Sequence, residues 1–258
     1  MKAHCFGSSS GGNCFLFEME GADPFFLECG IEWRKVLLNG MEQGLDVYNA
    51  SSCLITHSHG DHCKAWKEAS SQGISLFSSK ETLEALGAEG TALEINKPNR
   101  IAEGLYALPF PVRHDAVGSV GYYIKTKTES IAFVNDNKGI IADVSNFKPD
   151  YLFVECNYYD KQAKRILDDL KRYMAKGEMG GEYRKAHQAA QLLERNMKYH
   201  SSLLDTADTI ARFDLSKCKA IFLMHLSGRY ANEFEMKGLI KSRFRIDTYV
   251  CGAGGGIK

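Results

Sequence analysis

The sequence predicts an α/β fold in which two packed β-sheets are covered by helices. Short apolar, β-prone stretches alternate along the chain with segments of helical spacing, which indicates mixed strands and helices. The chain has 258 residues, 44% of them hydrophobic, which is enough to bury a sizeable core without disulfides. No repeat, linker or low-complexity block divides it, so we expect a single domain over residues 1–258.

Strands dominate the expected start of the chain. Residues 13–18 and 25–28 are rich in aromatic and apolar side chains on either side of a turn at 21–24, which is typical of strands. The glycine- and serine-rich stretch 7–12 before them is expected to be a flexible loop. Residues 31–44 place apolar side chains at approximately helical spacing and end at a glycine, which predicts a helix.

Helices and strands are expected to alternate through the rest of the chain. Ser79 is a suitable N-cap for one of these helices. Further helices are expected over 64–71, 79–86, about 161–211 with an interruption at 177–181, and 233–242. Further strands are expected over 52–56, 74–78, 105–113, 120–126, 130–135, 151–155, 220–224 and 246–250. The glycine-rich end, 252–258, is expected to be frayed.

Net charge and cysteine spacing limit the functions that the chain can have. Lys and Arg together number 32, as do Asp and Glu, so any affinity for nucleic acid must come from a local patch. The eight cysteines form no C-x-x-C pair and mostly lie in apolar runs, as expected of reduced thiols in a core. No segment looks like a signal peptide or approaches the roughly 20 apolar residues that span a membrane. We expect a cytoplasmic protein with no membrane partner.

Metal-ligating residue types occur where several expected strands stop. The strand over 52–56 runs directly into an H-x-H-x-D-H cluster, and three later strands stop at a histidine or an aspartate. Rigid strands fix such donors while loops leave an opening for substrate. Imidazole with carboxylate suits zinc, manganese or iron, and seven donors exceed the needs of one tetrahedral ion. The expected ligands of two metal ions are His57, His59, Asp61, His62, His114, Asp136 and His225.

Each of these residues also has an ordinary structural interpretation. A lone His114 or His225 is more often a hydrogen-bonded core histidine than a ligand, and Asp136 alone could cap the turn over 136–139. Their occurrence together favours metal ligands over the structural interpretation, because five of the eight histidines and two carboxylates follow apolar strands in a fixed order.

This pattern resembles that of the metallo-β-lactamase-fold hydrolases, and the resemblance covers most of the chain. It implies a four-layer αββα sandwich in which His57, His59 and His114 hold one metal ion. By the same resemblance Asp61, His62 and His225 hold the second ion, and Asp136 bridges the two. True lactamases usually have a cysteine in the second site, whereas Cys63 lies next to His62 and not where that ligand belongs.

Three shorter motifs resemble the YycJ (WalJ) branch, which is similar to nucleases and related to RNase Z. They are residues 7–14, 154–157 and 225–227. Two features depart from that branch. Glu28 stands where the superfamily usually has an aspartate that supports a metal ligand, and a glutamate could either do the same or shift the metal geometry. The helical segment 161–200 is also longer than expected.

The resemblance and the ligand set together imply a phosphodiesterase, expected to be a nuclease, that acts through a metal-bridging hydroxide. The expected cofactors are two divalent metal ions, zinc or manganese, which would lower the pKa of a shared water and stabilise charge on the reacting oxygens. Asp61 would orient the hydroxide. His200 is the candidate proton donor to the leaving alkoxide, because related enzymes place a histidine-containing loop there. A surface or helix-capping role is the alternative for His200.

The substrate class depends on a local excess of positive charge. Residues 161–200 hold ten Lys and Arg against five acidic residues, which beside a two-metal site favours nucleic acid. A solvated helix face explains the same charges. Overall neutrality leaves a cyclic-nucleotide phosphodiesterase as an alternative, and another ester or thioester hydrolase of the same fold as a second. A flavin-linked di-iron electron-transfer module fits less well, because the histidine set is complete and the chain has no room for a flavin domain. A homodimer is compatible with the sequence.

Overall fold

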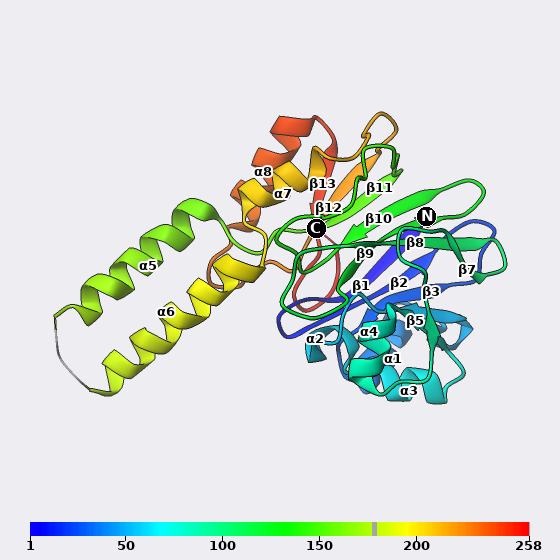
Figure 1. The fold of residues 1–258 in the computed structure, drawn as a ribbon, viewed down its shortest axis with the longest axis horizontal. Helices are drawn as coiled ribbons and strands as arrows, with labels where there is room; N and C mark the ends of the chain where they lie inside the picture. Colours follow the sequence, from blue (N-terminus) through cyan, green and yellow to red (C-terminus); the bar gives the residue numbers. More distant parts are fainter. Residues whose placement is uncertain (177–179, 258) are drawn as a thin grey trace.

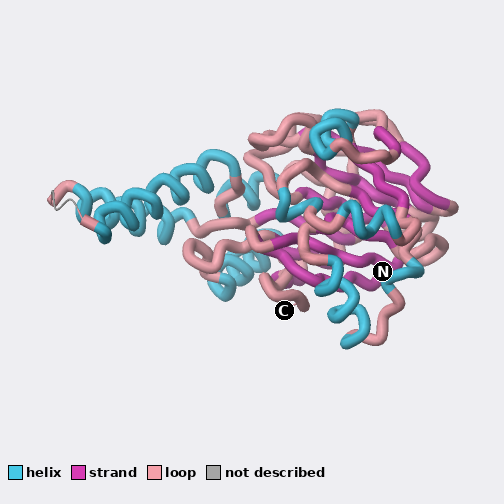
Figure 2. The backbone as a smooth tube through the Cα atoms, turned by 90° about the horizontal axis from the view of Figure 1, so that it is seen from below, coloured by secondary structure: helices cyan, strands magenta, loops and turns pink. Residues whose placement is uncertain are grey.

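Two β-sheets pack face to face between layers of helices in this computed structural model, which describes residues 1–176 and 180–257 (Figures 1 and 2). The first sheet has the strand order β1-β2-β3-β4-β5-β6. Strands β1 to β3 pair antiparallel, and β3 to β6 pair parallel. Their bounds are β1 (Lys2–Ser9), β2 (Gly12–Glu18), β3 (Phe25–Cys29), β4 (Ser52–Leu54), β5 (Ser75–Ser78) and β6 (Thr91–Ala92).

The second sheet has the order β13-β12-β11-β10-β9-β8-β7. Strands β7 to β10 pair antiparallel and β10 to β13 pair parallel. Their bounds are β7 (Asn99–Ala102), β8 (Leu105–Pro111), β9 (Val120–Lys125), β10 (Ser130–Val134), β11 (Tyr151–Glu155), β12 (Ala220–Met224) and β13 (Asp247–Val250). The carboxyl ends of the parallel strands in each sheet therefore lie at one edge, where polar side chains can meet.

Helices cover the outer face of each sheet. On the first sheet, Val36 and Ala69 pack with Leu16 and Phe26; on the second, Ile210 packs in the cluster of outward-facing side chains. The helices are α1 (Trp33–Glu42), α2 (Gly60–Cys63), α3 (Trp66–Ser71), α4 (Lys80–Leu86), α5 (Asp160–Met174), α6 (Gly181–Tyr199), α7 (Leu203–Ile210) and α8 (Glu233–Phe244), with a 3-10 turn η1 (Val47–Asn49).

Aromatic side chains fill the space between the two sheets. Phe15 and Phe17 alternate along β2 with Leu16, so the two phenylalanines face the opposite sheet while Leu16 faces the helices. Phe17 meets Phe153 of β11 edge to face, with ring centroids 5.0 Å apart. This central layer confirms the expected four-layer αββα sandwich.

Helices α5 and α6 form an arm that projects away from the sandwich (Figures 1 and 2). Leu193 of α6 and Ala163 of α5 are buried at its base with Tyr158 and Tyr230. The expected helical segment over about 161–211 is thus three helices, α5 to α7. The glycine interruption expected at 177–181 lies largely outside the described residues, which leave out 177–179.

Two segments expected to be loose are ordered. Residues 7–9 belong to β1, and Ser9 pairs with Gly12, so the expected flexible loop is reduced to a hairpin turn. The prediction of a frayed end is also wrong over 252–257. Cys251 forms a β-bridge with Ile257, and the Gly256 N–H donates a hydrogen bond to the Cys5 carbonyl. A positive φ angle at Gly256 permits this turn. Residue 258 lies outside the described part.

The cysteines lie in the core, as the sequence predicts. All eight are free, and all but Cys218 are buried. Burial raises the pKa of Cys156 to about 12, so this thiol stays protonated and behaves as an apolar core residue. Among the described residues, no helix is both long and apolar enough to cross a membrane.

Candidate metal centre

The loop after β4 and the short helix α2 that follows it carry the first four candidate ligands. Because β4 ends at Leu54 and α2 begins at Gly60, His57 and His59 lie in the loop, while Asp61 and His62 lie in α2. The backbone of residue 30 passes very close to this helix: a Cβ atom added to Gly30 would lie 1.7 Å from the Asp61 carbonyl oxygen. Only glycine permits this approach, so α2 could not lie this close to residue 30 if that residue had a side chain.

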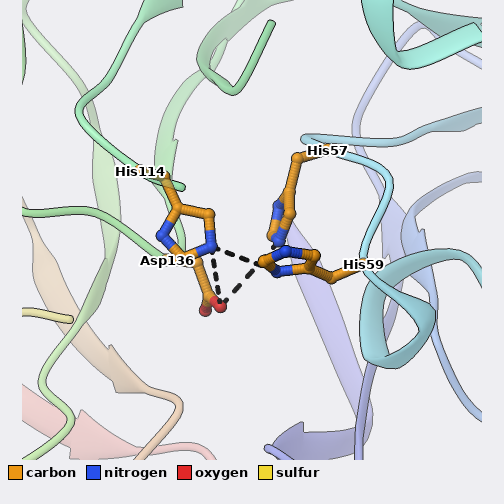
Figure 3. A group of neighbouring side chains, drawn as sticks. All are labelled: His57, His59, His114 and Asp136. Carbon is orange, nitrogen blue, oxygen red and sulfur yellow. Dashed lines mark hydrogen bonds and ion pairs between the residues drawn. The ribbon is translucent and has the colours of Figure 1, made fainter. Parts of the chain in front are cut away.

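One group of donors joins this loop to the second sheet. His57, His59, His114 and Asp136 each offer one atom, all within 4.8 Å of one another. Figure 3 shows the three imidazole rings and the carboxylate facing one another. His114 Nε2 lies 3.2 Å from His59 Nδ1 and 3.8 Å from Asp136 Oδ2. These are the residues expected to hold the first metal ion.

A second group lies beside the first and shares Asp136 with it. Its members are Asp61, His62, Asp136 and His225. His62 Nε2 lies 3.2 Å from Asp136 Oδ2, and His225 Nε2 lies 3.5 Å from Asp61 Oδ2. Since Asp136 belongs to both groups, its carboxylate is placed where a bridging ligand would stand. All seven expected ligands are thus brought together.

The chemistry of these side chains fits metal ions. His57 Nε2 and His225 Nε2 are buried and have no hydrogen-bond partner among the described residues, although an unpaired buried nitrogen is costly. Both residues belong to the donor groups, so coordination through these nitrogens would satisfy them. Imidazole nitrogens around a shared carboxylate suit zinc or manganese. The two groups can therefore hold two divalent metal ions.

The surroundings of the four histidines shift their pKa values in opposite directions. Burial lowers the pKa of His57 and of His114, which favours the neutral imidazole that a metal ion needs. Burial acts the same way on His62 and His225, but the carboxylates around them, Asp136 first, together outweigh it and raise both pKa values, that of His225 to about 10. Metal binding would therefore release protons from His62 and His225.

Three site residues have left-handed backbone conformations that non-glycine residues rarely adopt. The φ angles are 65° at Glu28, 33° at Asp136 and 55° at His225. Such conformations cost about 1–3 kcal/mol each and persist where the surrounding structure enforces them. Here they aim two ligands and one supporting carboxylate at the same centre.

His200 lies beside the second group, at the end of α6, and it forms a further cluster of possible ligands with Asp136, Glu155 and His225. Its Nδ1 is 2.6 Å from Glu155 Oε1, and Glu155 also accepts the backbone N–H groups of Asn137 and Ser201. Burial lowers the pKa of His200, but the Glu155 carboxylate outweighs it, and the net shift is upward. With Nδ1 facing Glu155, Nε2 is the ring atom left to meet a substrate.

Sequence reasoning assigned no role to two carboxylates at the site. Glu155 ends β11, so the rule that strand ends deliver donors could have found it. Asp115 directly follows His114; its Oδ1 lies 3.1 Å from His114 Nε2 and 3.5 Å from His59 Nε2. No local pattern marks Asp115, because its contacts depend on how the loops fold together.

A cavity of about 540 Å³ opens in front of the donors. Asp61, Asp136, His200 and His225 contribute to its lining, together with residues of α6 and of the loop 227–230. A substrate in this cavity would reach both donor groups and His200 at once.

Comparison with solved structures shows that the chain has the metallo-β-lactamase fold. It is similar to the metallo-β-lactamase fold protein YhfI from Bacillus subtilis, at 13% identity and a TM-score of 0.66, covering 99% of this chain and 98% of that one. It is also similar to Igni18, a metallo hydrolase from Ignicoccus hospitalis, at 15% identity and a TM-score of 0.63, covering 100% and 99%. Human tRNase Z, short form, matches at 16% identity and a TM-score of 0.56, covering 89% and 94%. No family model and no curated protein sequence matches the chain.

Proposed function

We propose that this protein is a dinuclear-metal phosphodiesterase that acts as a nuclease, of the YycJ and RNase Z-like branch of its fold. The observation that carries the proposal is that Asp136 belongs to both groups that hold the seven expected ligands, and that the ligand atoms within each group lie within 4.8 Å of one another. A pair of metal ions stabilises charge on both the entering and the leaving oxygen of a phosphodiester and lowers the pKa of coordinated water. The similarity in fold to a tRNase Z is consistent with this chemistry.

Three side chains at the site have further roles in the proposed reaction. Asp61 lies at the cavity wall, where its carboxylate can orient the attacking water. His200 is the proton donor to the leaving oxygen, because Glu155 holds its ring in place and favours the protonated form. Glu155 is a positioning residue, since it acts through His200.

The charge of the α5–α6 arm favours a nucleic acid over a small substrate. Three of its cations form ion pairs within the arm: Lys171 with Glu194, Arg172 with Asp169 and Lys185 with Glu182. The side chains of these cations are more than half exposed, so the pairs contribute little and can exchange for phosphate contacts. The local excess of positive charge is therefore available to a polyanion.

A hydrolysis screen tests the proposal. Labelled single- and double-stranded DNA and RNA, 3′,5′-cyclic nucleotides and bis-p-nitrophenyl phosphate are each incubated with Mn²⁺ or Zn²⁺. We expect cleavage of at least one nucleic acid. Cleavage of cyclic nucleotides alone would favour a small-molecule phosphodiesterase, which the cavity of about 540 Å³ could also accommodate. Hydrolysis of carboxylic esters or thioesters without phosphodiester cleavage would overturn the proposal.

A further inference from the structure

Two arginines from different elements line the same cavity as the donors. Arg195 comes from α6, and Arg229 comes from the loop after β12; both line the cavity together with Asp61 and Asp136. Both are exposed, so their guanidinium groups can meet a ligand that enters. Neither belongs to the donor groups, so the role of their charge lies outside metal binding.

Among the described residues, 1–176 and 180–257, Arg195 forms an ion pair with one carboxylate, that of Asp115. Its Nη2 donates to Asp115 Oδ2 at 3.1 Å, and Asp115 in turn contacts His114. A guanidinium has five N–H groups that can donate hydrogen bonds, so most of the N–H groups of Arg195 can still donate to a ligand. The contact with Asp115 ties the position of Arg195 to the first donor group.

Arg229 has a fixed backbone and an unengaged guanidinium. Its carbonyl accepts a hydrogen bond from Gln162 of α5 at 3.1 Å, and the next residue, Tyr230, is 4% exposed. Within the described part of the chain, its guanidinium forms no ion pair. A cation held at a cavity wall without an acidic partner is suited to an anionic ligand.

We propose that Arg195 and Arg229 form a second anion subsite, which binds a phosphate group one nucleotide away from the scissile phosphate. This inference rests on the proposed function and defines its substrate further. Guanidinium groups match phosphate geometry and bind it through charge-assisted hydrogen bonds. A cyclic mononucleotide has one phosphate and cannot occupy both the donor groups and this subsite. The subsite therefore selects a nucleotide chain.

A matched pair of chromogenic esters tests the subsite. Thymidine 5′-(p-nitrophenyl phosphate) has only the scissile phosphate, and its 3′-phosphorylated form has a second one. We expect a kcat/KM about tenfold higher for the 3′-phosphorylated ester, as one charge-assisted hydrogen bond of about 1.5 kcal/mol would give. Arg229→Gln should reduce this preference about tenfold. Arg100→Gln, which removes the same charge on β7 outside the cavity, should keep it.

Binding measurements keep the test independent of turnover. In calorimetric titrations with Mn²⁺ present, thymidine 3′,5′-bisphosphate should bind about tenfold more tightly than thymidine 5′-monophosphate, and Arg229→Gln should remove the difference. Equal affinities in the unaltered protein, or an unchanged preference in Arg229→Gln, would overturn the subsite. Failure to cleave either ester while the binding preference persists would instead contradict the proposed function.

Discussion

Glu28 Oε1 lies 3.2 Å from His62 Nδ1, and the same buried carboxylate accepts a hydrogen bond from the backbone N–H of Thr56. The Thr56 hydroxyl also contacts Glu28, and it lies 2.9 Å from His57 Nδ1. One carboxylate thus orients a histidine of each donor group, directly for His62 and through Thr56 for His57. Glu28 therefore makes the contact with a metal-ligand histidine that the aspartate usual at this position was expected to make.

Removing the charge of Glu28 should weaken metal binding. Glu28→Gln keeps the size of the side chain but leaves His62 without this anionic support, and the loss of such a support typically costs 10–100-fold in metal affinity. Competition with a chromogenic chelator measures the change. Glu89→Gln, an exposed substitution, is the matched control. An unchanged affinity in Glu28→Gln would contradict the supporting role.

The purified protein should hold two transition-metal ions per chain. His57→Ala and His62→Ala each remove a ligand from one group only, so each should lower the metal content by about one ion. Asp61→Ala or His59→Ala should abolish turnover without unfolding the chain, because both side chains lie in or beside a loop and not in the core. Elemental analysis and circular dichroism measure these outcomes. A metal-free protein that neither ion activates would contradict the donor groups.

The ends of strands could be predicted from sequence because the apolar runs are short and stop abruptly at polar residues. The ligands from His57 to His62 and those after β8, β10 and β12 followed from that pattern alone. Contacts between distant loops could not be predicted: Asp115 meets Arg195 across 80 positions of the chain. The course of the first hairpin was also missed, because glycine- and serine-rich sequence indicates a loop unless its pairing partner is known.

His200 should matter most for substrates with poor leaving groups. A nucleoside alkoxide must be protonated as it leaves, whereas p-nitrophenolate leaves without help, and general acid catalysis contributes roughly 10²–10⁴-fold. His200→Ala should therefore slow nucleic-acid cleavage by about that factor and bis-p-nitrophenyl phosphate hydrolysis far less. His187→Ala, an exposed histidine on the same helix, is the control. Equal losses on both substrates would favour a structural role for His200.

Asp205 should stabilise the fold in a pH-dependent way. It forms a capping box with Ser202 at the start of α7, and Lys138 Nζ lies 2.5 Å from its carboxylate. Burial raises the pKa of Asp205, but Lys138 and Ser202 outweigh it and the net shift is downward. A depressed pKa in the folded state means that the stabilisation is present above the unfolded pKa of about 3.9 and is lost as the pH falls through the folded value.

The substitution Asp205→Asn should therefore lower the free energy of unfolding by about 1 kcal/mol at pH 7. The difference from the unaltered protein should shrink below about pH 4, where the carboxylate becomes protonated first in the unfolded state and then in the folded state. Urea unfolding followed by circular dichroism at the two pH values measures it. Asp208→Asn, an exposed residue of the same helix, should have a smaller effect. A difference that is constant with pH would show that the charge of Asp205 is not its source.

Charge reversal on the arm separates a polynucleotide substrate from a small one. If nucleic acid lies along α5 and α6, reversing Lys171, Arg172, Arg184 and Lys185 should weaken binding, because each lost phosphate contact removes about 0.9 from the slope of log affinity against log salt on duplex DNA. Cleavage of nucleic acid should fall relative to hydrolysis of bis-p-nitrophenyl phosphate, which is bound in the cavity, whose lining includes none of these four cations. Fluorescence anisotropy over a salt series measures the slope. An unchanged slope and an unchanged cleavage ratio would assign these cations to a solvated helix face and favour the small-molecule phosphodiesterase.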